Sequence, residues 1–480
     1  MTKSAEPARK MSLKTILGFA AGSLPLSAVG TAMGISVQPY YAQDLGLGLI
    51  PIAIAFCVVR IIDSFVDPAL AVVMDRTRTP IGRYRAWMLV GMPVLMLAVY
   101  QLFMAKHGVG LTYLMVWYFV FALGTSTVGL SRGAWSANLI TRYDQRARFY
   151  GYLGFIAVVG TLIVLGTPVV SGQIDKLFHI TSRPNDVQLM GWTVLALIPI
   201  GTLITALFVR EPITVDAAGH HFKWQDFRDI LRKPEVIRLS ISQFALTLSP
   251  GWMGNLYIFF FTAARGFTQP QAYLLLILYV LSGVLGAPLI GYLGGRFSKH
   301  RTMIASTIGY SLGLCTVVVA PKGDTPLGLI VAVPIMIWCG FMGNGFDLMT
   351  SAMMADVGDQ VRLEQGKERM AVLFALTGLA AKWAAAGAVI ISYPLLAMIG
   401  YQPPLAGHNS PAALRGLEIV FIAGPIFWCV VGGLCFLGWK LDAAKHADIR
   451  MKLEARDAIL AASSMTEEAE FMVAEAEARA

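Results

Sequence analysis

Two aspartates lie four residues apart in a stretch that is otherwise apolar enough to cross a membrane, Arg60-Ile-Ile-Asp63-Ser-Phe-Val-Asp67. Residues four apart on a helix point the same way, so both carboxylates face one side, with Arg60 nearby. One charge facing lipid costs about 3 kcal/mol, so three would cost about 9 kcal/mol. We therefore expect these side chains to face a protein interior or a watery cavity. There, paired carboxylates would attract Na⁺ or share a proton.

The composition indicates a protein that crosses the membrane many times. The chain has 480 residues, of which 56% are hydrophobic and 14% charged, and its mean hydropathy is +0.63. A soluble domain would carry about 25% charged residues. The repeated long apolar runs favour helices over a barrel. The net charge of +9 comes from loops between these runs, so it does not indicate a nucleic-acid partner.

The apolar runs predict about twelve transmembrane helices and hence an all-α membrane protein. Their expected limits are 15–41, 48–74, 87–105, 110–140, 149–171, 190–209, 238–263, 269–294, 302–320, 326–353, 371–398 and 415–439. We expect a first six-helix bundle over 1–209, a linker over 210–237, a second bundle over 238–440 and a tail over 441–480. The linker contains a short amphipathic pattern at 222–232, and the tail is charged and Ala-rich.

Alternate loops are rich in Lys and Arg, which predicts the orientation. The basic set contains Arg83, Arg142, Arg228, Arg301 and Arg369, whereas the other set holds few basic residues. By the positive-inside rule the basic loops and both termini are cytoplasmic, in the inner (plasma) membrane.

Two Gly/Arg loops stand at matching places in the two halves, 75–85 and 291–301. This correspondence predicts an internal repeat, typical of transporters whose halves rock against each other. We expect the first loop to act as a cytoplasmic gate through Asp75, Arg83 and Arg85, with Arg296 in the second. Arg60, in the apolar run before the first loop, is expected to take part in gating as well. A basic loop that only sets the topology is the alternative.

These residues resemble a known family, the glycoside–pentoside–hexuronide:cation symporters of the major facilitator superfamily. The resemblance is carried by Arg60, Asp63, Asp67, Pro68 and the Gly82-Arg83-x-Arg85 loop. Further similar segments are Trp135-Ser136 and 355–369, which leads to Lys382. The resemblance implies a twelve-helix fold of two pseudo-symmetric bundles. It also implies a coupling cation on Asp63 and Asp67, a nearby Lys382, and Asp356 and Asp359 as part of the gate.

The sequence also departs from the family pattern. Two aspartates that the family's sugar binders use are missing, one from the stretch 22–26 and one at Ser131, which Arg132 follows. In the family an asparagine, which offers a neutral oxygen ligand, stands beside the second acid, and here that position is Val66. The loss of this ligand slightly favours H⁺ over Na⁺ as the coupling ion. A substrate with a carboxylate or phosphate would explain Arg132 and Lys382 as replacements for the lost acids.

Several other polar or aromatic side chains within apolar runs are candidates for the site. Thr127 and Ser131 could complete a Na⁺ shell, although this signal is weak. For the substrate we consider Arg132, Trp135, Trp252, Asn255, Asp347 and Lys382. Each also has a structural alternative, namely snorkelling for Arg132, a packed aromatic core for the tryptophans, and a contact to a neighbouring helix for Asp347.

The sequence therefore predicts a symporter that moves a small organic solute, sugar or sugar-acid-like, with H⁺ or Na⁺ by alternating access. A carrier of lysolipid or another amphiphile, a drug exporter, and a membrane sensor or scaffold remain alternatives. We expect no cofactor, no enzymatic activity and a monomer. The Gly129-x-Ser131-x-Gly133 pattern lies within a membrane helix, so it does not indicate a hydrolase.

Overall fold

The computed structural model describes residues 11–139, 143–178, 185–211, 232–365, 370–442 and 444–457. Within these ranges the chain is helical apart from short connections, and no strand occurs. Eleven helical segments there are long and apolar enough to cross a membrane. The predicted all-α membrane fold is confirmed. The amphipathic pattern at 222–232 lies almost entirely outside the described residues.

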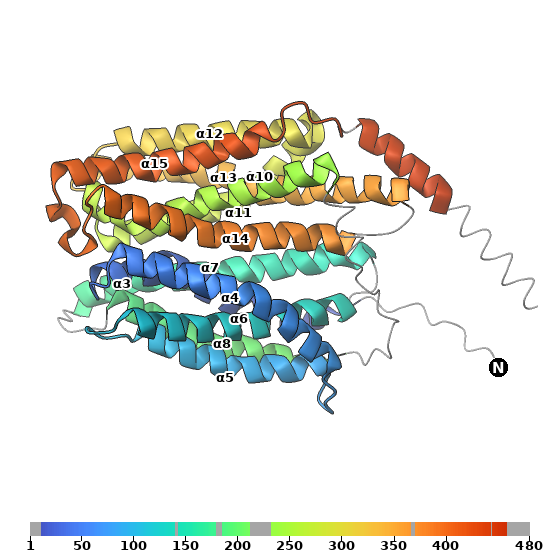
Figure 1. Cartoon of the computed structure of the whole chain (residues 1–480), viewed down its shortest axis with the longest axis horizontal. Helices are drawn as coiled ribbons and strands as arrows, with labels where there is room; N and C mark the ends of the chain where they lie inside the picture. The colour runs from blue at the N-terminus through green and yellow to red at the C-terminus, as the bar shows by residue number, and fades with distance from the viewer. Residues whose placement is uncertain are drawn as a thin grey trace, which may run out of the picture.

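The helices of the first half run side by side along the long axis of the molecule (Figure 1). The first span consists of α1 (Leu13–Ala20), α2 (Ser23–Ala32), the π-helical η1 (Met33–Val37) and α3 (Gln38–Gln43). The other spans are α4 (Leu49–Arg76), α5 (Arg83–Phe103), α6 (Leu111–Leu139), α7 (Tyr143–Phe178) and α8 (Asp186–Phe208).

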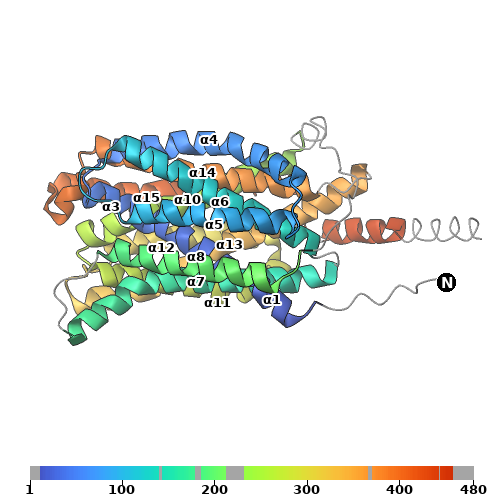
Figure 2. The same ribbon diagram turned by 90° about the horizontal axis from the view of Figure 1, so that it is seen from below.

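The second half forms a matching group of helices, which occupies the upper part of the same view. It comprises α10 (Pro234–Ile258) with the π-helical η2 (Phe259–Ala264), α11 (Gln269–Phe297), α12 (Lys299–Val319), α13 (Pro326–Gln365), α14 (Met370–Met398), the short 3₁₀ segment η3 (Pro403–His408) and α15 (Pro411–Leu434). The two bundles meet where α4 contacts α14 and where α7 contacts α11. In the view from below the helices again run along the long axis, and those of the two halves overlap (Figure 2).

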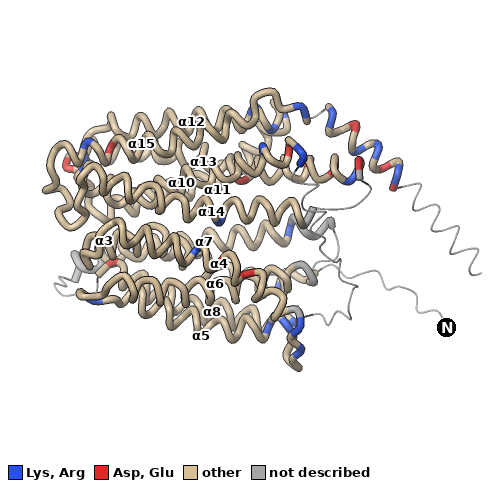
Figure 3. Tube along the Cα trace, in the orientation of Figure 1, with Lys and Arg blue, Asp and Glu red and all other residues tan. Residues whose placement is uncertain are grey.

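The observed helices agree with the predicted spans except that α7 and α13 are longer. α13 continues to Gln365 instead of ending near 353. Hydropathy detects only the part of a helix that lies in the apolar core, and the extra turns of α13 carry Asp356 and Asp359. Charged residues also gather at this end of the bundle (Figure 3).

The seventh span, α10 with η2, is absent from the eleven candidates because it carries polar side chains. Ser242, Gln243, Ser249 and Asn255 of α10 are all buried. Ser242 and Ser249 donate hydrogen bonds to carbonyl oxygens of α15, those of Gly432 (3.2 Å) and Pro425 (3.0 Å). Carbonyl oxygens of α15 therefore satisfy the hydroxyls of Ser242 and Ser249, and α10 completes the set of twelve spans.

One π-helical segment lies within the first span and the other ends the seventh, and these two spans hold equivalent places in the two halves. A π-helical turn is rare and often marks a functional site. The occurrence of such a turn in both of these spans supports the internal repeat expected from the two Gly/Arg loops.

Glu211, which follows α8, caps the N-terminus of α5. Its Oε1 accepts hydrogen bonds from the backbone N–H groups of Arg83 and Tyr84 (3.1 Å each), and its Oε2 accepts one from Arg85 (2.9 Å). A carboxylate at this position satisfies unpaired donors and complements the helix dipole. A side chain at Gly82, which has φ +113°, would collide with this carboxylate.

We expect Glu211→Ala to lower stability by about 1–2 kcal/mol, because three backbone donors of α5 lose their acceptor. The measurement is the thermal midpoint of the detergent-solubilised protein, followed by tryptophan fluorescence. Glu211→Gln keeps one acceptor oxygen and should lie between the wild type and the alanine variant. Equal midpoints for all three proteins would contradict the capping role.

Candidate functional site

The two acids of α4 each contact a basic side chain. Oδ2 of Asp63 lies 3.1 Å from Nη1 of Arg60, and Oδ1 accepts a hydrogen bond from Ser126 Oγ of α6 at 3.2 Å. Asp67 forms an ion pair with Lys382 of α14, so this contact joins the two bundles. The four charges cancel one another, which lowers the cost of holding them within an apolar bundle.

A cavity of about 250 Å³ opens beside these ion pairs. It is lined by Arg60, Asp63 and Lys382, together with the hydroxyl-bearing Thr125 and Ser126 of α6. The Lys382 side chain is 46% exposed, so it is not enclosed by packed side chains. A carboxylate beside neutral hydroxyl oxygens is a donor set that suits a small hard cation or a proton.

A larger cavity of about 420 Å³ lies between the bundles. Its wall includes Gln38 of α3 and Asn255 of α10, which are 3% and 5% exposed. Among the described residues, Gln38 Oε1 and Asn255 Nδ2 have no hydrogen-bond partner. One acceptor and one donor, from opposite bundles, therefore lie buried in the wall of this cavity without a protein partner, and leaving them unsatisfied costs about 1–3 kcal/mol each.

The remaining wall of the larger cavity is smooth and partly aromatic. Gly30 and Gly34 line it, and a Cβ added at either glycine would meet nothing within 4 Å. Phe56 and Tyr118 also line it, and their rings stack with centroids 4.1 Å apart. A flat apolar face combined with a few polar groups suits a ring that carries hydroxyls.

Arg60 lines both cavities. Its Nη1 holds Asp63, whereas its Nε is buried and has no partner among the described residues. The sequence assigned Arg60 to gating, but the structure places it at the boundary between the acidic pair and the larger cavity.

Arg132 and Trp135 lie away from both cavities. Arg132 Nη2 donates hydrogen bonds to Ser23 Oγ (2.9 Å) and to the carbonyl oxygen of Phe19 (3.3 Å), and the guanidinium lies over the Phe19 ring. Trp135 is fully buried and packs edge-on against the same ring. Both residues therefore tie α6 to the first span, and Arg132 does not share a cavity with Lys382 as an anionic substrate would require.

Thr127 and Ser131 do not join the acidic pair either. The Thr127 hydroxyl donates to the carbonyl oxygen of Leu123 (2.7 Å), and its methyl group packs near Gly91 of α5. Ser131 is fully buried and donates to Val128 (3.1 Å). The sequence reasoning correctly placed a hydroxyl ligand on α6 but chose the wrong residues. The hydroxyl that contacts Asp63 belongs to Ser126.

Of the other substrate candidates, only Asn255 lines the larger cavity. The indole N–H of Trp252 donates to the carbonyl oxygen of Val420 in α15 at 3.0 Å. Asp347 accepts a hydrogen bond from Gln243 Nε2 at 3.1 Å, which matches its alternative role as a partner of a neighbouring helix.

The gating candidates of the first half and Arg296 form local contacts. Arg83 and Arg85 provide backbone donors to Glu211. Arg296 is exposed and donates to the hydroxyl of Tyr292 on its own helix (3.1 Å). The Asp75 side chain and residues 366–369 lie outside the described part of the chain.

Asp356 and Asp359 instead hold a helix of the tail, residues 444–457. His446 Nε2 lies 3.3 Å from Asp356 and 3.1 Å from Asp359, and Arg450 lies 3.6 Å from Asp359. Lys299 of α12 pairs with Asp356 at 2.7 Å. Ile449 and Leu453 of the tail helix are buried in the main core. This part of the tail is therefore docked on the extension of α13.

We expect Asp359→Asn to loosen the tail helix, because its carboxylate contacts both His446 and Arg450. Partly exposed ion pairs contribute about 0.2–1 kcal/mol, so trypsin should cleave near Arg450 about threefold faster. Asp448→Asn is the control, since Asp448 pairs with Lys452 inside the helix. Equal cleavage of the wild type and Asp359→Asn would contradict the docking role.

The sequence reasoning missed Gln38, Tyr118, Ser126 and Glu211. The signal for Gln38 was available, since an amide within an apolar span is uncommon and needs a partner. The other three residues gain their roles from the way distant helices pack, which periodicity along one helix does not reveal.

The comparisons with known proteins agree with this architecture. A family model described as "MFS/sugar transport protein" matches residues 18–443. An uncharacterized symporter of Bacillus subtilis, YnaJ, is 23% identical over 95% of this chain and 97% of its own length. The sodium-dependent lysophosphatidylcholine symporter 1 of Xenopus tropicalis is 21% identical over 94% of this chain and 92% of its own. The crystal structure of the nucleoside transporter NupG has a TM-score of 0.64, with 14% identity over 90% of this chain and 100% of that chain, which shows a shared fold.

Proposed function

Because the chain belongs to the MFS/sugar transport family, we propose that it is a cation-coupled symporter of a small polar solute, sugar or sugar-acid-like. The observation that carries this proposal is the pair of adjoining cavities that share Arg60. The smaller one offers an acid and hydroxyl oxygens. The larger one offers an acceptor and a donor from opposite bundles.

The coupling cation, H⁺ or Na⁺, binds the acidic pair of α4. When it neutralises Asp67, the attraction between Asp67 and Lys382 weakens, and with it a contact that joins the two bundles. When it occupies Asp63, it competes with Arg60 for that carboxylate. Charge neutralisation also lowers the cost of moving this face of α4 through an occluded state.

The solute binds in the larger cavity, where both bundles contact it. Hydroxyl groups can donate to Gln38 Oε1 and accept from Asn255 Nδ2, while one face of a sugar ring packs on Tyr118. A carboxylate on the solute would be drawn to Arg60. A ligand that contacts both bundles biases their relative position, as alternating access requires.

An amphiphile such as a lysolipid is the second candidate, favoured by the similarity to the lysophosphatidylcholine symporter. The polar groups and volume of the larger cavity favour the smaller polar solute. For the orientation, we propose that the end of the bundle rich in Lys and Arg, with both termini, is cytoplasmic.

Uptake into proteoliposomes tests the function directly. Neutral sugars, uronates and lysolipids are offered separately, with an inward Na⁺ gradient, an inward H⁺ gradient or neither. We expect gradient-driven accumulation of at least one sugar or uronate with one of the two ions. Accumulation of lysolipid alone would favour the second candidate, and absence of uptake and counterflow for every compound would favour a sensor or scaffold.

A further inference from the structure

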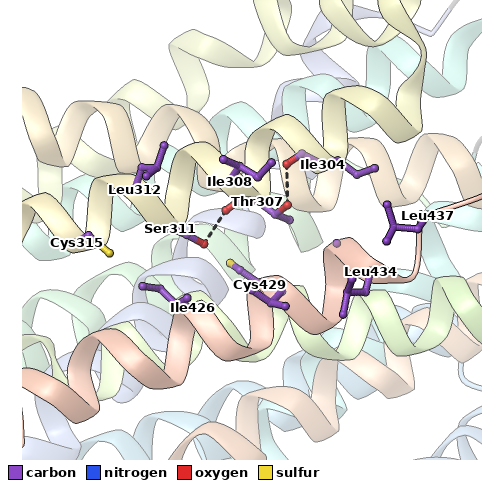
Figure 4. Close-up of a pocket in the computed structure, with 12 residues that line it drawn as sticks. Ile304, Thr307, Ile308, Ser311, Leu312, Cys315, Ile426, Cys429, Leu434 and Leu437 are labelled. Atoms are coloured by element: carbon purple, nitrogen blue, oxygen red, sulfur yellow. Dashed lines mark hydrogen bonds between the residues drawn. The ribbon is translucent and has the colours of Figure 1, made fainter.

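A long apolar groove runs between α12 and α15 on the outside of the second bundle (Figure 4). Its volume is about 340 Å³. The rims carry Ile308, Leu312, Val430 and Leu434, which are 50–60% exposed in the protein alone. Exposed apolar residues on the outer face of a transmembrane helix contact lipid, so the groove opens to the bilayer.

The polar atoms in the floor of the groove already have partners. Thr307 Oγ1 donates to the carbonyl oxygen of Ile304 (2.8 Å), and Ser311 Oγ donates to that of Thr307 (2.7 Å), as the dashed lines in Figure 4 show. The Cys429 thiol lies 3.2 Å from Ser249 Oγ beneath the floor. These donors are therefore satisfied within the protein, and the surface that remains suits a hydrocarbon chain rather than a polar ligand.

The length of the groove corresponds to one leaflet of the membrane. It extends along α12 from Ile304 to Cys315, which is about 16 Å at 1.5 Å per residue. Half of the hydrocarbon core of a bilayer is about 15 Å thick. The groove starts beside Leu437, at the end of the bundle where α12 begins and α15 ends.

Basic side chains surround the mouth of the groove. Arg301 is exposed and lies one helical turn before Ile304, hence on the same face of α12. Lys440 is exposed just beyond α15. Arg238 donates to the carbonyl oxygen of Cys435 at 2.7 Å, which places a third positive charge at this end. The nearby acid, Asp442, accepts a hydrogen bond from the N–H of Lys445 (2.9 Å).

We propose that this groove binds an anionic glycerophospholipid of the adjacent leaflet. One acyl chain fills the groove from Ile304 to Cys315, and the phosphate lies at the mouth near Arg301 and Lys440. The polarity of the floor, the length and the charge at the mouth all select this occupant. The site is separate from the two cavities, so it does not depend on the proposed transport activity.

Native mass spectrometry of the detergent-solubilised protein tests the proposal, with equal amounts of dioleoylphosphatidylglycerol and dioleoylphosphatidylcholine as probes. We expect one retained lipid per chain and a strong preference for phosphatidylglycerol. Each basic side chain near an anionic lipid contributes about 1 kcal/mol, so R301Q combined with K440Q should reduce this preference about 30-fold.

Filling the groove tests the acyl-chain part of the site. Ser311→Phe should displace the retained lipid of both kinds, whereas Ile330→Phe, at a 66% exposed position on α13, should not. If Ser311→Phe lowers the melting midpoint of the delipidated protein, Cys315→Phe, at an exposed position in the same groove, replaces it. Equal retention of the two lipids by the wild type, or unchanged retention in a folded groove-filling variant, would overturn the proposal.

Discussion

We expect Asp63→Asn and Asp67→Asn to abolish uphill accumulation while leaving solute exchange intact. A neutral solute coupled to one monovalent cation can accumulate about 50-fold at 100 mV, because one charge gains about 2.3 kcal/mol. Without a carboxylate the cation has no site, so the carrier only equilibrates the solute and the accumulation ratio falls to about 1. The measurement is the steady-state uptake of the identified solute by proteoliposomes with an imposed potential.

Two controls accompany this measurement. Asp324→Asn removes a carboxylate from an exposed loop and should accumulate solute as the wild type does. Counterflow without a gradient should persist in Asp67→Asn. The loss of the Asp67 carboxylate leaves the exposed Lys382 without its ion-pair partner. Full accumulation by a variant carrying asparagine at both positions would refute the role of the acidic pair.

The second large effect is expected from Gly34→Leu, which narrows the larger cavity. A Cβ at Gly34 meets nothing within 4 Å, so the added side chain projects into free space and the protein should still fold. It occupies the volume in which we place the solute. An overpacked site costs about 1–3 kcal/mol, so we expect solute affinity to fall by about 10- to 100-fold.

Gly291→Leu on α11 is the matched control, because Gly291 is exposed and its Cβ would also meet nothing within 4 Å. Its uptake should equal that of the wild type. Solute affinity is measured by counterflow in both variants, with the thermal midpoint as a check of folding. If the solute affinity of Gly34→Leu equals that of the wild type, the solute binds somewhere other than this cavity.

The sequence predicted the elements of this protein better than the contacts between them. Long apolar runs located the spans because the bilayer fixes their length and composition. The seventh span was predicted as 238–263 even though buried Ser242 and Ser249, whose hydroxyls are satisfied by α15, lower its hydropathy. The extension of α13 was missed because a helix in water carries no apolar run.

The candidate site was predicted in part. Helical periodicity placed Asp63 and Asp67 on one face of α4, and intramembrane charge made Lys382 conspicuous; the Asp67–Lys382 ion pair joins them. The role of Arg132 could not be derived in this way, because its contacts with Ser23 and Phe19 depend on how α6 packs against the first span. The same limit explains why Thr127 was chosen in place of Ser126.

The position of Arg60 on the walls of both cavities has a thermodynamic consequence. A guanidinium cannot satisfy Asp63 and a solute to the same extent at once, so each ligand changes the free energy with which the other binds. Linkage makes that change reciprocal, so the factor by which the ion alters solute affinity equals the factor by which the solute alters ion affinity. Calorimetric titration of either ligand against the other therefore measures one and the same coupling constant, and Arg60→Gln should bring it close to unity.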